Sequence, residues 1–492
     1  MTSAVPENSR SATKLRLWTD GSWLVPVLLL GIVLLGATIR VRGALNDLWM
    51  DEIWSVELAR TLASPGDVFI ALHNENNHYL NTIWIALIGP TENSLWYRLP
   101  AILAGIGATL IAAMLGARRG RPEMLFSAGL TAWSYPLVLY SSEARGYSLA
   151  VLCGLAALYL LPRADRERRG LMALFAAVEV IGLLSHLSFV NVVMATFAWS
   201  TWNGWRRGWP RRAQLTQCAW LHLVPLLVLG ALYAVDLRLL RDGEGTVAPS
   251  LIHSFGSALA WTVGTSSERV PLFIACLTAL AGLYAGLRRL ERDRSGAIVF
   301  FVGVIVVFPA GLLVVRNSEI VYVRYFLFSV TFLLILYSYV LGHWFRRGGG
   351  WAIASVGLAL LHLLLNAQCL GELFRHGRGQ YRAALDFIVH TSAPRSGRIV
   401  LGSDEDFRTL KPVLYYGPRA SAVRPIHYQL NTEVTPDGFD VVILTRESFQ
   451  PAADLSSEFT DGYGNRYQLL KEFRTAPLSG IHWFVYGKLP RS

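Results

Sequence analysis

Apolar segments long enough to cross a lipid bilayer recur along the first three quarters of this chain. A spanning helix needs about 20 apolar residues, with a lower limit of about 17. Eleven such segments are predicted, at about 23–42, 97–117, 122–140, 147–162, 171–186, 187–203, 215–235, 270–287, 296–315, 325–344 and 351–369. In a chain of 492 residues with 53% hydrophobic content, this pattern predicts a polytopic α-helical membrane protein.

The net charge of +11 comes from arginines that lie in short loops between the apolar segments. That placement is typical of cytoplasmic membrane loops, so it argues against a nucleic-acid partner. The four cysteines form no CxxC pair, and they indicate neither a disulfide framework nor a structural zinc site. The polar start of the chain and the absence of a convincing cleavage site favour a retained signal anchor in the first segment.

The arginines also predict the orientation of the segments. With a cytoplasmic N-terminus, the loops after the even-numbered segments must be cytoplasmic, and all five are basic. Their arginines are Arg118, Arg119 and Arg121; Arg163, Arg166, Arg168 and Arg169; Arg206, Arg207, Arg211 and Arg212; Arg288, Arg289, Arg292 and Arg294; Arg346 and Arg347. We therefore expect a multi-pass protein of the cytoplasmic (inner) membrane, with residues 43–96, 141–146 and everything after 370 on the outer face.

Two domains are expected. Residues 1–370 form the transmembrane domain, and its first outer loop (43–96) carries two amphipathic interfacial helices, Asp51–Leu62 and Asn77–Ile88. Residues 371–492 are more polar and predict an extracytoplasmic α/β domain. Its expected elements are a helix at Gln380–His390 and strands near Arg398–Gly402, Asp440–Thr445, Tyr467–Phe473 and Ile481–Tyr486.

An acidic pair, Asp51 and Glu52, follows the first apolar segment between Trp49 and Trp54. Acids at the start of an interfacial helix favour the positive end of the helix dipole, and this alone explains their position. Carboxylates among apolar residues at a bilayer surface are costly to desolvate, however. A catalytic general base is the alternative interpretation.

Two further polar clusters are expected on the same face. One runs from His73 to Asn81 and includes Asn77, His78 and Tyr79; its spacing fits no zinc motif, and it suits sugar hydroxyls or a phosphate equally well. The other, between the third and fourth segments, contains Glu143, Arg145 and Tyr147, where the acid and the arginine could also form a local ion pair. Outer arginines near segment ends, among them Arg98 and Arg324, are candidates for binding an anionic headgroup, because guanidinium holds phosphate oxygens bidentately.

These motifs, in this order, resemble those of the C-type (GT-C) integral membrane glycosyltransferases, in the branch of the protein O-mannosyltransferases and the aminoarabinose transferases. The resemblance is best over residues 48–161. The matching motifs are Asp51-Glu52, Asn76-Asn77-His78-Tyr79-Leu80, Tyr97-Arg98-Leu99-Pro100, Ser142-Glu143-Ala144-Arg145-Gly146-Tyr147 and the later Arg324-Tyr325-Phe326. Relatives often carry a proline at the position of Tyr79 and a basic residue at that of Trp54.

The resemblance implies a GT-C-like bundle, a polyprenyl-phosphate-linked sugar donor and an inverting transfer to a lipid, glycan or protein acceptor. It implies that Asp51 is the catalytic base and that Glu52 assists it. His78 and Glu143 would line the substrate cavity, and Arg145 and Arg324 would contact the phosphate. Asn77, Tyr79, Tyr147 and Arg98 are the remaining candidate substrate-binding residues.

Other functions remain open at this point. A transporter or flippase of lipid-linked saccharides would show charged residues inside its spans and inverted repeats, whereas the predicted spans are mostly clean. A polysaccharide polymerase or ligase would also use outer arginines. No metal ligand is predicted, and a divalent metal cofactor is left open.

Overall fold

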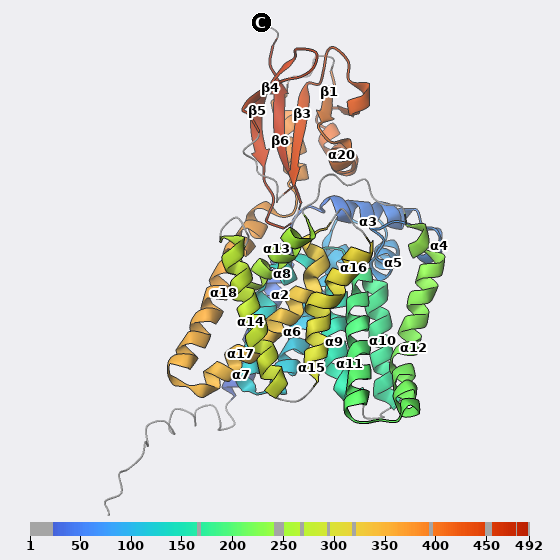
Figure 1. Cartoon of the computed structure of the whole chain (residues 1–492). Coiled ribbons are helices and arrows are strands. Elements are labelled where there is room, and N and C mark those ends of the chain that lie inside the picture. The colour runs from blue at the N-terminus through green and yellow to red at the C-terminus, as the bar shows by residue number, and fades with distance from the viewer. Residues whose placement is uncertain are drawn as a thin grey trace, which may run out of the picture.

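The protein is an upright helix bundle with a smaller sheet domain above one end (Figure 1). The structure is a computed structural model, and it describes residues 23–164, 169–240, 250–265, 270–292, 296–316, 321–392, 397–447, 455–478 and 480–490. The first 22 residues and loop residues 165–168 and 293–295, whose basic side chains support the predicted orientation, lie outside the described residues.

Each of the eleven predicted segments is helical. The helices are α2 (Leu24–Gly43), α6 (Leu95–Ala117), α7 (Arg121–Trp133) with α8 (Tyr135–Tyr140), α9 (Tyr147–Ala164), α10 (Arg169–Ser185), α11 (Val190–Arg206), α12 (Arg211–Val235), α14 (Leu272–Arg292), α15 (Ala297–Val302) with α16 (Phe308–Arg316), α17 (Leu327–Arg347) and α18 (Gly349–His376). Among the described residues, seven helices are long and apolar enough to cross a membrane: α2, α6, α9, α12, α14, α17 and α18. The prediction of a mostly helical, multi-pass membrane protein is confirmed.

A proline divides the third predicted segment into α7 and α8. Pro136 has no backbone N–H, so the carbonyl of Ala132 has no donor one turn further on. The guanidinium of Arg40, on α2, donates instead to the carbonyls of Ala132 and Thr131, at 3.0 and 3.2 Å. In the same region the Ser142 hydroxyl donates to the carbonyl of Arg40 at 3.0 Å. Arg40 therefore connects α2 both to the end of α7 and to the turn that follows α8.

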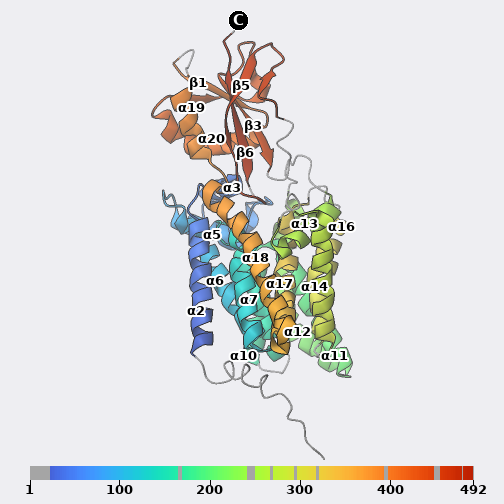
Figure 2. The same cartoon turned by 90° about the vertical axis from the view of Figure 1, so that its left-hand side faces the viewer.

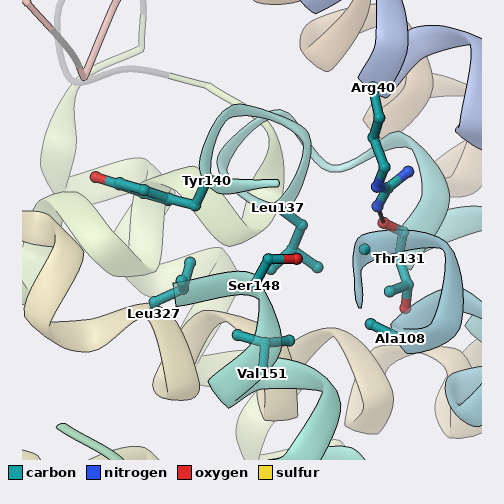
Figure 3. Close-up of a pocket in the computed structure, with 9 residues that line it drawn as sticks. Arg40, Ala108, Thr131, Leu137, Tyr140, Ser148, Val151 and Leu327 are labelled. Atoms are coloured by element: carbon teal, nitrogen blue, oxygen red, sulfur yellow. Dashed lines mark hydrogen bonds between the residues drawn. The ribbon is translucent and has the colours of Figure 1, made fainter. Parts of the chain in front are cut away.

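A small cavity with room for about one water molecule adjoins this arginine. Figure 3 shows Arg40 reaching the carbonyl of Thr131 beside the cavity. The lining residues are Arg40, Gly105, Ala108, Thr131, Leu137, Tyr140, Ser148, Val151 and Leu327. Because the lining is mostly apolar and the space is small, this cavity cannot hold a sugar.

The first outer loop folds into three short helices at the sheet-domain end of the bundle. They are α3 (Met50–Arg60), α4 (Asp67–Ile70) and α5 (Tyr79–Ile88), and α3 lies across the bundle, below the sheet domain (Figures 1 and 2). The two helices expected in this loop are thus present as α3 and α5. On the same side of the bundle, α13 (Leu251–Val263) precedes α14.

The C-terminal domain is a six-stranded mixed sheet with two helices. Its elements are α19 (Tyr381–Thr391), β1 (Ile399–Ser403), α20 (Asp406–Ser421), β2 (Ile426–Tyr428), β3 (Val441–Glu447), β4 (Glu458–Thr460), β5 (Arg466–Phe473) and β6 (Ile481–Lys488), in the sheet order β2-β1-β3-β6-β5-β4. Strand β1 runs parallel to β2 and β3, whereas β3, β6, β5 and β4 pair antiparallel. The predicted helix and all four predicted strands are observed.

Three elements of this domain were not predicted: α20 and the short strands β2 and β4. Helix α20 contains Pro412 and Pro418, and prolines normally interrupt helices. The last bundle helix, α18, continues to His376, six residues beyond the expected domain boundary at 370.

The C-terminal domain packs directly on α3. The amide of Leu48 donates to the hydroxyl of Tyr416 at 2.7 Å, and Lys411 on α20 forms an ion pair with Glu57 on α3 at 2.9 Å. The rings of Trp54 and Phe407 meet edge to face. Residues of α3, α19, α20, β1, β3 and β6 share one hydrophobic core, so the acidic motif is held from both sides.

Candidate active site

Asp51 lies in the first turn of α3 and binds two arginines through one oxygen. Its Oδ2 atom is 3.1 Å from Nη1 of Arg145, in the turn before α9, and 3.0 Å from Nη1 of Arg324, in the short helix before α17. The Asp51 residue is 6% exposed. Three segments far apart in sequence therefore meet at one carboxylate.

The two arginines keep unused hydrogen-bond donors. Within the described residues, the buried Nε atoms of Arg145 and Arg324 have no hydrogen-bond partner. The Arg145 side chain is 4% exposed and that of Arg324 is 21% exposed. Two guanidinium groups facing one carboxylate, with donors to spare, form a site that favours a further anion.

Asn76 and His78 hold Arg145 in place. The Asn76 carboxamide accepts from Nη1 of Arg145 and donates to the Asp51 carbonyl and the Ser55 hydroxyl, at 3.0 and 3.1 Å. His78 Nε2 is 3.0 Å from Nη2 of Arg145. The loop that precedes α5 thus fixes the arginine that binds Asp51.

His78 is a neutral side chain in this environment. Burial, reinforced by the charges of Arg145, His186 and Arg324, holds the pKa of His78 well below its usual value. The ring also packs against Tyr147 and His186, with centroids 5.3 and 4.7 Å away. A neutral imidazole has a single acceptor nitrogen, and here it is Nδ1, which accepts from the Gly146 amide, so the ring adds no charge to the site.

Gly146 is required where this turn touches α10. A β-carbon at this position would lie 1.8 Å from the carbonyl oxygen of Ser185, which no side chain can tolerate. The Gly146 amide donates to Nδ1 of His78 at 3.0 Å. The glycine lets the turn approach closely enough for Arg145 and His78 to meet.

Aromatic rings border the guanidinium groups. Arg324 lies 4.4 Å from the ring centroid of Tyr322 and 6.0 Å from that of Tyr325, and Arg145 lies 5.5 Å from that of Tyr147. Such contacts stabilise a cation while leaving its edge free to donate.

Glu52 occupies a different environment from its neighbour. It is 0% exposed and accepts from Nε and Nη2 of Arg98 at 2.8 and 2.6 Å, from the Ala144 amide at 2.6 Å and from the Trp49 amide at 3.1 Å. Burial alone would raise the pKa of Glu52, but the charge and hydrogen bonds of Arg98 outweigh it and the pKa lies below its ordinary value.

Arg98 is fully committed to protein groups. Besides Glu52, it donates to the carbonyls of Ala44, Asn46 and Asp47, at 2.6, 2.8 and 2.9 Å. This pair joins α6 to the segment between α2 and α3, and it offers a phosphate little to bind.

Glu143 lies beside the acidic pair but does not contact Asp51 directly. One of its oxygens accepts from the indole N–H of Trp49 at 3.1 Å and forms an ion pair with Arg378. Arg378 belongs to the segment between α18 and α19.

Asn77 and Tyr79 face away from the Asp51 centre. Asn77 donates to the carbonyls of Val68 and Leu72, and the Tyr79 hydroxyl donates to the buried carboxylate of Asp236 at 2.5 Å. His73 binds the other oxygen of Asp236 at 2.8 Å. This group fastens the first outer loop to the end of α12.

The structure therefore brings Asp51, Arg145, Arg324, His78 and Tyr147 together, and it places Glu52 with Arg98, Glu143 with Arg378, and Asn77 and Tyr79 elsewhere. Asn76 and Arg378 were missed as individual site residues. Asn76 could have been found from its motif, whereas Arg378, flanked by two glycines after the last span, carries no chemical signature. Among the described residues, no three histidine, cysteine or acidic side chains converge as metal ligands.

No protein-family model matches this sequence, and no curated protein matches it. Solved structures do resemble it in fold. The ArnT protein of Cupriavidus metallidurans in its apo state superposes with a TM-score of 0.50 at 14% identity, over 94% of this chain and 97% of that one. This chain has the C-type glycosyltransferase fold.

Two further solved structures bear on the comparison. The Archaeoglobus fulgidus oligosaccharyltransferase tethered to an acceptor peptide matches with a TM-score of 0.50 at 10% identity, over 82% of this chain and 64% of that one. This chain therefore spans about two thirds of the length of the archaeal enzyme. ArnT bound to undecaprenyl phosphate covers the same shares as its apo form, at 14% identity and a TM-score of 0.42.

Proposed function

We propose that this protein is an inverting membrane glycosyltransferase. It takes a sugar from a polyprenyl-phosphate donor and transfers it to a lipid, glycan or protein acceptor. The observation that carries the proposal is the Asp51 centre, where one carboxylate faces two arginines with unused donors. The C-type glycosyltransferase fold supports it, as does the lipid phosphate, undecaprenyl phosphate, that ArnT binds.

The charges around Asp51 suit a phosphodiester. The linked pairs comprise four guanidinium groups, of Arg98, Arg145, Arg324 and Arg378, and three carboxylates, of Asp51, Glu52 and Glu143. The carboxylate of Glu447 also interacts with Arg324 and Asp51, and it is paired with Arg408. Among the seven groups above, four positive and three negative charges leave one positive charge over. A sugar linked to a polyprenyl phosphate carries one negative charge at this phosphate and would neutralise it.

The transfer is a single displacement. The acceptor hydroxyl or amine attacks the anomeric carbon of the sugar, and its proton passes to the Asp51 carboxylate. The bond between the anomeric carbon and the phosphate oxygen breaks, and its electron pair leaves with the polyprenyl phosphate. Arg145 and Arg324 stabilise the charge that develops on that phosphate.

Binding of the sugar donor should also release Asp51 from its two arginines. Without a ligand, one oxygen of Asp51 is occupied by both arginines. A phosphate that binds the same guanidinium groups competes with the carboxylate for them. We therefore expect the donor to bind before the acceptor is activated.

The arginine pattern of the opposite loops supports a reaction on the outer face of the cytoplasmic membrane. Helix α3, which carries Asp51, lies at the end of the bundle that bears the C-terminal domain (Figure 2).

The test is transfer by the full chain in proteoliposomes that contain an undecaprenyl-phosphate-linked sugar and a panel of acceptors. Wild type should release undecaprenyl phosphate and form a glycosylated product, and Asp51→Asn should form it up to about 10⁴-fold more slowly while remaining folded. Undiminished turnover in that variant contradicts the assignment of the base. Movement of the sugar lipid across the bilayer without transfer would instead identify a flippase.

A further inference from the structure

A buried ion pair links the segment that leads into the C-terminal domain to the turn between α8 and α9. Residues 377–380 connect α18 to α19 and are called the strap below. Arg378, on the strap, is buried at the end of the bundle and is 2% exposed. It forms an ion pair with Glu143, which is fully buried. A buried arginine from outside the bundle is therefore paired with a residue of the turn that carries Arg145.

Arg378 and Glu143 both contact the side chain of Trp49. The guanidinium carbon lies 4.0 Å from the centroid of the Trp49 ring, and Glu143 accepts from the indole N–H at 3.1 Å. Trp49 is the residue that caps the N-terminus of α3, and its own amide donates to Glu52. Asp51 follows two residues later, so the ring held by Arg378 fixes the start of the helix that presents the carboxylate.

The strap itself has little freedom. Gly377 adopts a φ of +62°, and a β-carbon there would lie 2.8 Å from the side chain of Asn46. A β-carbon on Gly480, in the segment before β6, would lie 1.9 Å from the carbonyl oxygen of Arg378. The Ala476 amide donates to the Gly377 carbonyl at 2.9 Å. The C-terminal domain therefore sets where Arg378 stands.

We propose that Arg378 is a positioning residue of the active site, supplied by the strap of the C-terminal domain, which holds Asp51 in place through Glu143 and Trp49. This inference rests on the proposed function for its effect on turnover. On this view the C-terminal domain completes the active site. Arg378 contacts no reacting atom, and it acts through Trp49.

The experiment compares full-length Arg378→Lys, Arg378→Gln, Glu143→Gln and the double variant Glu143→Gln/Arg378→Gln in lipid nanodiscs. Arg382→Gln is the matched control, since Arg382 also joins the C-terminal domain to the first outer loop through an ion pair with Asp47 but does not contact Trp49. Three quantities are measured: Tm, hydrogen–deuterium exchange of the peptide covering residues 48–53, and turnover with a polyprenyl-phosphate sugar.

Each neutral single variant leaves a buried charge without its partner and should lower Tm, whereas the double variant should recover Tm. Amide exchange at residues 48–53 should rise in both Arg378 variants and in the double variant, because Lys and Gln cannot stack a planar cation on the Trp49 ring. Turnover should fall about 100-fold in kcat at an unchanged KM for the donor, as displacement of a catalytic group by about 1 Å does. Arg382→Gln should leave all three quantities near the wild-type values.

Unchanged exchange at residues 48–53 in the Arg378 variants would overturn the inference, whether or not the protein transfers sugar. Recovery of exchange protection and kcat by the double variant would overturn it too, because the pair would then be structural only. Absence of transfer by wild type, with the exchange pattern as expected, would overturn the proposed function and leave the positioning of α3 supported.

Discussion

Two adjacent acids, Asp51 and Glu52, form ion pairs that differ in how completely their hydrogen-bonding groups are used. Glu52 meets Arg98 bidentately, and both of its oxygens accept additional backbone amides. Asp51 shares one oxygen between two arginines, and the Nε atom of each arginine has no partner within the described residues. We call the Glu52–Arg98 pair the saturated centre, because both carboxylate oxygens accept two hydrogen bonds each. We call Asp51 with Arg145 and Arg324 the unsaturated centre, because donors of both arginines are unused within the described part of the chain.

This difference indicates a structural role for the Glu52–Arg98 pair and a role in ligand binding and catalysis for Asp51 and its two arginines. A saturated buried pair has nothing left to offer a ligand, and its removal leaves an uncompensated charge. An unsaturated pair can exchange one of its members for an incoming anion. The acid pair as a sequence motif does not distinguish the two roles, but the hydrogen bonds do.

The largest expected effect is on turnover at the unsaturated centre. Asp51→Asn should reduce transfer by up to about 10⁴-fold, the upper range for a general base. The same change should tighten the binding of undecaprenyl phosphate, because the anion that competes for both arginines is gone. Affinity is measured by titration of the lipid into nanodiscs that contain each variant. Weaker binding in Asp51→Asn would contradict the competition between carboxylate and phosphate.

A substitution at the saturated centre should lower the free energy of unfolding. Glu52→Gln leaves Arg98 buried without a counter-charge and should cost about 3–5 kcal/mol of unfolding free energy. Thermal unfolding in detergent measures this loss. If Glu52→Gln instead retained wild-type Tm and lost only turnover, Glu52 would belong to the chemistry.

The same pair should make stability depend on pH. The pKa of Glu52 is lowered from 4.5, so the folded state binds a proton less readily than the unfolded chain. Its contribution is complete above pH 4.5 and is lost as the pH falls through the lower folded-state pKa. Comparison of Tm between pH 7 and pH 3 should show a steeper acid loss in wild type than in Glu52→Gln.

A smaller effect is expected for the arginines of the unsaturated centre. Arg145→Gln and Arg324→Gln each remove charged hydrogen bonds to the donor phosphate, worth about 1.5–3 kcal/mol. Undecaprenyl phosphate should therefore bind about 10- to 100-fold more weakly, as titration into nanodiscs will show. Equal affinity in both variants and wild type would place the phosphate elsewhere.

The smallest effect is expected at an exposed ion pair of the domain interface. Lys411 and Glu57 are 2.9 Å apart but partly exposed, so Lys411→Ala should change the unfolding free energy by less than about 1 kcal/mol. Calorimetry in detergent provides the value. A loss as large as that of Glu52→Gln would show that this interface depends on its surface charges.

Much of the fold follows from local sequence patterns. Apolar length predicted all eleven helical segments, because a helix in lipid must satisfy its own backbone and therefore needs a continuous apolar run. Alternation predicted the longer strands of the C-terminal domain. Helix α20 was missed although Pro412 and Pro418 lie inside a strongly amphipathic segment, and its packing on α3 and the sheet stabilises it.

The sequence by itself determined which residue types gather at one end of the bundle: the acidic pair, the polar histidine loop and the outer arginines. Their order along the chain resembles that of the C-type glycosyltransferases, and this resemblance predicted the fold. Only the tertiary structure decided which arginine meets which acid, and that Arg378 enters from the strap. The physical reason is that ion pairing depends on distance and on the donors left unused, and both are set by packing between segments as far apart as Asp51 and Arg324.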